Sequence, residues 1–330
     1  MMATSMRAAA RRGADSTLVC IGNLTIDEAV HDSLLADSET AVARPEAASA
    51  PRDRLRSAPA MGGDAAYAAL AARLHLADVR MLAPIGTDLP SSFFSTLRAA
   101  GIRTDDLPHR NLPTVRNIID YFADGTRRWN MLCSEADFDA LSVYPADVPA
   151  WALEADAILI SAMSLESQLA LTPWLRANSE ARLYLDLQED YLVGTRDALF
   201  GIIAECDVFL PSEVEAVALA QTDDLITAGR LFQSLGPDTV VIKRAERGSL
   251  VFDGSSLTEV ATDHVEPVDS TGAGDAFCGA FAAVHCQTGD AVEAARAGAA
   301  AARIAITAFG IEALAAATTD HVSHERADAR

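Results

Sequence analysis

A glycine-rich run near the end of the chain combines an anion-binding backbone with a carboxylate. Residues 269–277 read Asp-Ser-Thr-Gly-Ala-Gly-Asp-Ala-Phe and lead into an Ala-rich segment with the spacing of an amphipathic helix. Because Gly272 and Gly274 have no Cβ, the backbone there can bend sharply and approach a ligand closely. The amides of Gly272, Ala273 and Gly274 would be free at the first helical turn, where the helix dipole attracts anions.

Asp275 adds a proton acceptor to this run. A carboxylate in the same turn stays ionised and can take a proton from an alcohol. Phosphoryl transfer to a hydroxyl group needs both functions, because charge develops on the phosphoryl oxygens while the attacking hydroxyl loses its proton. A simple helix N-terminus with small residues and a capping acid would share the short Gly-x-Gly-Asp pattern, so the surrounding residues decide between the two interpretations.

The whole run resembles the C-terminal signature of the PfkB (ribokinase-like) carbohydrate kinases, Asp-Thr-x-Gly-Ala-Gly-Asp-x-Phe, with Ser270 in place of the first Thr. The likeness extends over most of residues 18–312. It implies a ribokinase-like α/β fold, a doubly wound and mostly parallel sheet with helices on both faces and a small β lid. It also implies transfer of the γ-phosphate of Mg-ATP to a small sugar-like molecule, with Asp275 as general base, the Gly272–Gly274 amides as anion hole and Thr271 beside the nucleotide.

The N-terminal part carries the residues that the resemblance assigns to the acceptor substrate. Asp27 ends an apolar stretch similar to the family's first strand, and a carboxylate can accept hydrogen bonds from two adjacent hydroxyls. Gly62, Gly63 and Asp64 resemble the start of the family signature Gly-Gly-x-x-x-Asn-x-Ala, which makes Asp64 a second hydroxyl acceptor. Tyr67 stands where that signature has Asn, so it is either a ligand contact or a core residue.

The predicted lid carries one further candidate. Arg116 lies near the start of a predicted strand, where its side chain either reaches the substrate or stays solvated. A lid that closes over the acceptor would exclude water and limit wasteful ATP hydrolysis. The family likeness also implies a homodimer formed through the lid.

Two segments resemble the nucleotide side of the family site. Ser212 and Glu215 occupy the pattern Pro-Asn-x-x-Glu, which organises phosphate and Mg2+ through water, although the same pair also fits a capping box. Lys243 ends an apolar run and is a candidate contact for ATP phosphates. Gly248 is expected to shape the following turn, in which Ala245 stands where the family usually has its first Gly.

Some family members hold a monovalent cation such as K+ near the glycine-rich loop, through carbonyls around Asp269 and Thr271. The sequence leaves open whether this chain does so. The segment 299–310 resembles the helix and loop that shelter adenine.

Composition excludes several classes of function. The 330-residue chain has a formal net charge of -21, which argues against nucleic-acid binding and a membrane-surface role. The sequence contains no apolar run long enough to predict a membrane span. Its five cysteines are scattered without a Cys-x-x-Cys pair, so disulfides and zinc are not expected, and reduced thiols in a cytoplasmic protein fit best.

Short apolar runs alternate with helical stretches in the second half of the chain, a rhythm that indicates βαβ units and a mostly parallel sheet. Strands are predicted there at residues 157–161, 182–187, 208–211 and 239–242. Earlier, residues 18–27 read as one buried strand. Asp124-Gly125 predicts a hairpin turn of the lid. Several polar residues follow apolar runs and should meet at the carboxyl edge of the sheet, where such folds bind ligands: Asp27, Asp88, Asp186, Ser212, Lys243 and Asp275.

We therefore expect one kinase domain over residues 16–316, with lid segments at about 28–60 and 110–135. Residues 1–15 and 318–330 are predicted to be disordered tails. Two other functions stay open at this level. One is a nucleoside kinase, because the same site accepts a ribose ring. The other is a catalytically weak sugar- or nucleotide-binding regulatory homologue. A Rossmann dehydrogenase is disfavoured, since the first strand lacks Gly-x-Gly-x-x-Gly.

Overall fold

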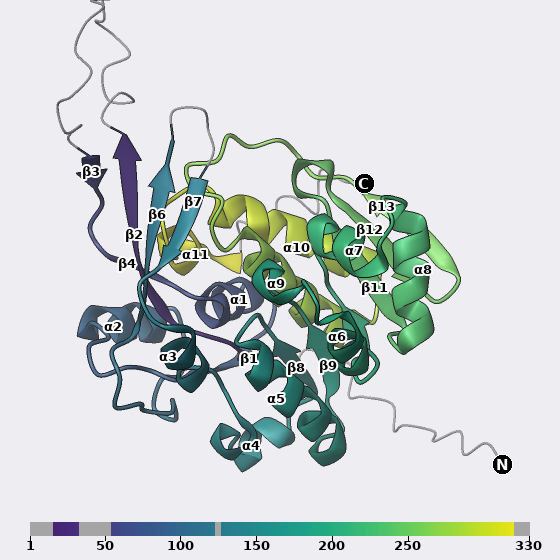
Figure 1. Ribbon diagram of the computed structural model, residues 1–330, viewed down its shortest axis with the longest axis horizontal. Coiled ribbons are helices and arrows are strands. Elements are labelled where there is room, and N and C mark those ends of the chain that lie inside the picture. The colour runs from purple at the N-terminus through teal and green to yellow at the C-terminus, as the bar shows by residue number, and fades with distance from the viewer. Residues whose placement is uncertain (1–15, 33–53, 123–126, 320–330) are drawn as a thin grey trace, which may run out of the picture.

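A large mixed sheet with helices on both faces forms the body of the molecule, and a smaller sheet stands beside it (Figure 1). The computed structural model describes residues 16–32, 54–122 and 127–319. The main sheet has the strand order β13-β12-β11-β10-β9-β8-β1-β5. Its strands are β1 (Thr17–Ile21), β5 (Asp78–Leu82), β8 (Ala157–Ile160), β9 (Arg182–Leu185), β10 (Val208–Phe209), β11 (Thr239–Lys243), β12 (Ser249–Asp253) and β13 (Ser256–Val260).

The pairing within this sheet confirms the predicted α/β architecture. Strands β5, β1, β8, β9, β10 and β11 pair in parallel, while β12 and β13 extend the edge as antiparallel hairpin strands. Parallel neighbours need crossover connections, which the intervening helices supply. The result is a mostly parallel sheet with helices on both faces, as the resemblance implies.

Alternate residues of the central strands pack into two separate cores. In β1, Leu18 and Cys20 join the core on one face, whereas Val19 and Ile21 join the core on the other. The first face is covered by α1 (Asp64–Ala72), α2 (Ser91–Ala99), α9 (Ala273–Thr288), α10 (Ala291–Ala305) and α11 (Glu312–Ala316). The second is covered by α4 (Ala150–Leu153), α5 (Leu165–Asn178), α6 (Arg196–Ile203), α7 (Glu213–Ala220) and α8 (Leu225–Leu235).

Four further short helical elements lie within the described residues. They are α3 (Glu135–Ala140) and the single-turn helices η2 (Pro145–Asp147), η3 (Glu189–Tyr191) and η4 (Ala245–Arg247). None of the helices in the described part of the chain is both long and apolar enough to span a membrane.

The second sheet, called the lid sheet below, has five strands. They are β2 (Thr25–Asp32), β3 (Arg54–Arg56), β4 (Ala60–Gly62), β6 (Val115–Tyr121) and β7 (Arg127–Met131). β2 lies between β6, which runs parallel to it, and the short antiparallel strands β3 and β4. β7 is an edge strand.

The prediction of one strand over residues 18–27 was wrong. The chain leaves the main sheet after Ile21 and enters the lid sheet at Thr25, so the apolar run contains two strands from different sheets. The run hides this break because both strands are buried and neither shows an alternating pattern. A Cβ on Gly22 would lie 3.0 Å from the amide nitrogen of Ala65, so the chain turns close against the start of α1. The predicted Asp124-Gly125 turn and the predicted terminal tails up to residue 15 and from residue 320 lie outside the described residues.

Candidate active site

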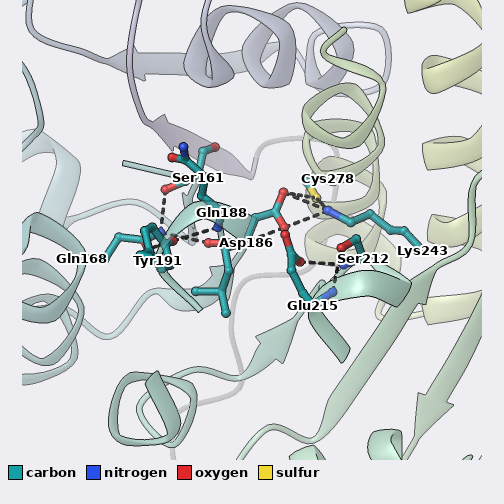
Figure 2. Close-up of polar contacts among 10 residues, drawn as sticks. Ser161, Gln168, Asp186, Gln188, Tyr191, Ser212, Glu215, Lys243 and Cys278 are labelled. Carbon is teal, nitrogen blue, oxygen red and sulfur yellow. Dashed lines mark hydrogen bonds and ion pairs between the residues drawn. The ribbon is translucent and has the colours of Figure 1, made fainter. Parts of the chain in front are cut away.

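Polar residues gather where the parallel strands of the main sheet end. Figure 2 shows Asp186 after β9, Ser212 after β10 and Lys243 at the end of β11, all facing the same region beside α9. Ligands bind at this edge in open α/β sheets because the loops there are free to carry polar groups.

The glycine-rich loop forms the start of α9, as predicted. Gly272 is the N-cap, with φ 72°, a left-handed conformation that favours glycine. A Cβ at this position would also lie 2.4 Å from ring atoms of Tyr67. Both the backbone conformation and the packing therefore require glycine. Gly274 is exposed, so the amides of this first turn are open to a ligand.

Asp275 lies in the first turn of α9 and is partly buried. Burial raises the pKa of its carboxyl to about 7, the negative charge of Asp186 adds to the effect, and Lys243 opposes it. A base with a pKa near neutrality combines availability at physiological pH with a strong tendency to accept a proton.

Asp64 brings a second carboxyl to the same region. It is the first residue of α1, and α1 packs against α9 so closely that a Cβ on Gly279 would lie 2.0 Å from the carbonyl oxygen of Ala68. Burial raises the pKa of Asp64 well above its ordinary value, and the charges of Asp275, Asp186 and Asp27 add to this rise. The predicted substrate carboxylates and the predicted base thus lie close enough to repel one another.

Asp27 is fixed by its neighbours in the lid sheet. Its Oδ1 accepts hydrogen bonds from Thr25 Oγ1 and Asn117 Nδ2, each at 2.8 Å. A Cβ on Gly62 would lie 1.9 Å from Asp27 Oδ2, so the glycine makes room for the carboxylate. Burial raises the pKa of Asp27 to about 6, and the two hydrogen bonds moderate this rise. Asn117 was missed from the sequence because it lies 90 positions away from its partner.

Gly63 caps α1 with φ 100°. A Cβ there would lie 2.4 Å from the carbonyl oxygen of Asn23, so the helix begins directly against the β1–β2 connection. Asn23 is 2% exposed, and neither polar atom of its side chain has a hydrogen-bond partner among the described residues.

Lys243 is paired with Asp186. Its Nζ lies 2.8 and 2.9 Å from the two carboxylate oxygens and 3.3 Å from Cys278 Sγ (Figure 2). Burial opposes the charge of Lys243, but Asp186, Cys278 and Glu215 raise the pKa of its ammonium above the ordinary value, so it stays charged. Asp186 was placed at this edge from the sequence, but its partner was not recognised.

Ser212 and Glu215 form the capping box that the sequence left as an alternative. Ser212 Oγ accepts from the Glu215 amide at 3.2 Å, and Glu215 Oε2 accepts from the Ser212 amide at 2.7 Å. Glu215 is only 5% exposed, and burial followed by the charge of Asp186 raises its pKa to about 8. A cap and a role near phosphate are compatible, because the second carboxylate oxygen is not used by the box.

Two predicted residues are buried with polar groups that have no partner in the described structure. Tyr67 is 1% exposed and its hydroxyl has none. Burial raises the pKa of Tyr67, and the charges of Asp27, Asp269 and Asp275 add to this rise, so the phenol stays protonated. Thr271 is 8% exposed and its Oγ1 also lacks a partner. Such groups usually find a partner, so a ligand is one way to satisfy them.

The remaining candidates have contacts of their own within the described structure. Arg116 donates to Asp88 at 2.8 Å and is partly exposed, so its contact with a substrate stays a prediction. Gly248 has φ 75°, and a Cβ there would lie 2.0 Å from the carbonyl oxygen of Val260, which explains the glycine as a turn residue. Asp269 Oδ1 accepts from the Thr271 amide at 2.9 Å.

The described residues contain no group of three or more His, Cys, Asp or Glu side chains arranged to hold a metal ion. The site still fits Mg2+ that arrives with a nucleotide, because Mg2+ keeps several waters and needs only one or two carboxylates besides phosphate oxygens. Burial, followed by the charge of Asp186, raises the pKa values of Glu215 and Asp275, and Lys243 opposes both rises, so a further cation near these carboxyls would be favourable.

The fold and this edge of the sheet define a ribokinase-like kinase. A model of the pfkB family carbohydrate kinases matches residues 8–317, and the chain belongs to this family. It is 30% identical over 259 residues to the cytidine kinase of Thermococcus kodakarensis, covering 76% of this chain and 88% of that protein.

Solved structures share the fold. A fructokinase with bound ATP from Xylella fastidiosa has a TM-score of 0.74 at 19% identity, covering 95% of this chain and 99% of the other. A ribokinase II in complex with ATP and Mg2+ from E. coli has a TM-score of 0.72 at 20% identity, covering 94% of this chain and 99% of the other.

Proposed function

We propose that this protein transfers the γ-phosphate of ATP to a hydroxyl group of a small, uncharged sugar-like molecule, with Asp275 as the general base. The observation that supports this most directly is the position of Asp275 in the first turn of α9, beside open amides and with a pKa raised to about 7. Gly272, Ala273 and Gly274 then donate to the phosphoryl oxygens as charge builds on them.

The nucleotide would lie over this loop, near Lys243. A Cβ on Gly274 would be only 3.7 Å from Lys243 Nζ, so the ammonium borders the proposed phosphate position. Ser212 and Glu215 would bind water around the phosphates, and Mg2+, when bound, would neutralise charge on the β- and γ-phosphates. Thr271 and the turn at Gly248 would border the nucleotide. A monovalent cation such as K+ near Asp269 stays a prediction.

The acceptor would bind between α1 and the lid sheet. Asp27 and Asp64 supply hydrogen-bond acceptors, Tyr67 supplies a donor, and the start of α1 at Gly62 and Gly63 forms the floor. Carboxyls that repel one another favour a ligand rich in hydroxyl donors and disfavour one that carries phosphate or carboxylate.

A nucleoside is the second candidate acceptor. The likeness to a cytidine kinase over most of the chain supports it, because a ribose presents adjacent hydroxyls in the same way. The family relatives also include a deoxyribokinase, so family membership alone does not choose between a free sugar and a nucleoside.

A homodimer through the lid sheet and a cytoplasmic location complete the proposal. Trp129, Met131 and Leu132 are 45%, 38% and 57% exposed on or beside the edge strand β7, and a partner would bury them. The described cysteines are free, which fits a reducing compartment.

The test is an ADP-release assay with Mg-ATP across a panel of sugars, polyols, nucleosides and sugar phosphates. We expect turnover with a neutral acceptor and a loss of about a hundredfold or more in Asp275→Asn. A wild-type protein that binds a sugar or nucleotide but transfers no phosphate would instead support the regulatory homologue. An Asp275→Asn variant with near-normal turnover would refute the assigned base.

A further inference from the structure

A side-chain hydrogen bond joins the lid sheet to the glycine-rich loop. Tyr121, the last residue of β6, donates its phenol hydrogen to Asp269 Oδ1, across 148 positions of the chain. Asp269 is 2% exposed and lies three residues before Gly272, the N-cap of α9. The lid sheet therefore contacts the segment that presents the proposed anion hole.

The same carboxylate oxygen also orders the loop. Asp269 Oδ1 accepts from the Thr271 amide at 2.9 Å, one residue before Gly272. The residue that caps the C-terminus of α10 also holds the loop, because the amides of Val268 and Asp269 donate to the carbonyl of Ile306 at 2.8 and 3.3 Å. The position of the Asp269 carboxylate thus affects the backbone immediately before the first amide of the anion hole.

One face of β6 carries two polar residues, one in each half of the site. Successive side chains of a strand alternate, so Asn117, Ile119 and Tyr121 share one face. Asn117 bonds Asp27 at 2.8 Å, Ile119 is fully buried, and Tyr121 bonds Asp269. One strand face thereby connects the proposed acceptor carboxylate with the proposed phosphate loop.

We infer that Tyr121 is a positioning residue that couples the lid sheet to the anion hole through Asp269. This inference rests on the proposed function. When β6 is in place, the phenol holds Asp269 and the loop keeps its amides directed at the phosphate. When the lid sheet moves away, Asp269 loses this partner and the loop is less ordered. Phosphoryl transfer would then require the lid sheet to be packed against the loop. This requirement favours transfer to the acceptor over transfer to water.

The first test is Tyr121→Phe, which removes the hydroxyl and keeps the ring. A hydrogen bond to a charged group justifies an expected fall in kcat of about tenfold. We expect the KM values for ATP and acceptor to change by less than about threefold, because neither substrate is bound by the phenol. Tyr144→Phe is the matched control: it removes another tyrosine-to-aspartate bond, from Tyr144 to Asp139 at 2.7 Å, and should retain turnover.

A double-mutant cycle tests the route through Asp269. If Tyr121 acts through this carboxylate, adding Tyr121→Phe to Asp269→Ala should cost little further kcat. Additive losses, or a Tyr121→Phe variant with wild-type kcat, would overturn the inference.

Hydrogen exchange separates this inference from the proposed function. Without any substrate, amides of residues 115–121 should exchange faster in Tyr121→Phe than in wild type or in Tyr144→Phe. Equal exchange in all three proteins would overturn the coupling, whatever the activity. If wild type transfers no phosphate to any acceptor, the proposed function fails, and the exchange comparison still decides whether Tyr121 holds the lid sheet to the loop.

Discussion

Lys243 forms a two-oxygen ion pair with Asp186, with its Nζ 2.8 and 2.9 Å from the carboxylate oxygens. The pair joins the ends of β11 and β9 and places an ammonium next to Gly274. In a chain with a formal net charge of -21, the proposed function needs a local cation of this kind for phosphate to approach. Asp186 both holds Lys243 in place and keeps it protonated against the effect of burial.

The buried carboxyls of the site should make the protein less stable as pH rises. Asp275 has a folded pKa of about 7, above the ordinary value of an aspartate, mainly because of burial. The folded state therefore binds more protons than the unfolded state between about pH 4 and pH 7, and stability is lost as pH rises through that range.

Asp275→Asn removes this contribution. We expect its melting temperature to exceed that of wild type at pH 8 and the difference to shrink at pH 5, as measured by thermal unfolding without ligand. Asp197→Asn, at an exposed residue of α6, serves as the control, because it removes a carboxyl that is not buried. A wild-type protein as stable as Asp275→Asn at pH 8 would show that the carboxyl carries no burial penalty.

Gly62→Ala should weaken acceptor binding through Asp27. The new Cβ would lie 1.9 Å from Asp27 Oδ2, so the carboxylate must rotate away from Thr25 and Asn117. Loss of charged hydrogen bonds of this kind predicts a rise in acceptor KM of about tenfold or more, with the KM for ATP nearly unchanged. The control is Gly201→Ala in α6, where an added Cβ has no neighbour within 4 Å. An unchanged acceptor KM in Gly62→Ala would exclude Asp27 from the acceptor site.

Local patterns were enough to predict the parts of the site that depend on short stretches of chain. The loop at Gly272 and the capping box at Ser212 each lie within one turn of a helix, so residue type and spacing determine them. The contact between Tyr121 and Asp269, and the pair of Lys243 with its partner 57 positions away, depend on how strands and helices assemble. A local sequence pattern cannot predict contacts between residues that lie so far apart along the chain.

Arg116 and Ala245 also show what the sequence alone does not predict. Arg116 reads as a free lid cation in the sequence, but Asp88 lies 2.8 Å away once the lid sheet packs on the main domain. Ala245 reads as a departure from the family pattern, and the structure shows that the backbone there adopts a left-handed φ of 50° without a glycine, which residue type alone does not predict.

Tyr67→Phe distinguishes a ligand contact from a core residue. The hydroxyl is buried without a partner, so its removal should leave stability unchanged or raise it by up to about 1 kcal/mol. If the hydroxyl donates to the acceptor, the acceptor KM should rise by about tenfold. Tyr184→Phe is the control, because it breaks a bond to His285 Nδ1 at 3.1 Å in the core and should lower stability by about 1 kcal/mol without changing this KM. Unchanged acceptor kinetics in Tyr67→Phe would assign Tyr67 to the core.

Ala245→Gly should increase stability although it removes a methyl group. Ala245 is exposed and adopts φ 50°, a conformation that costs a non-glycine residue about 1 kcal/mol. Glycine removes this cost but makes the unfolded chain more flexible, which offsets about half of the gain. We expect a net increase of about 0.5 kcal/mol in the free energy of unfolding, measured by urea titration. Ala170→Gly, at an exposed position inside α5, should instead lower it by about 1 kcal/mol. An equal fall in the free energy of unfolding in the two variants would mean that alanine adopts the left-handed conformation at position 245 without strain.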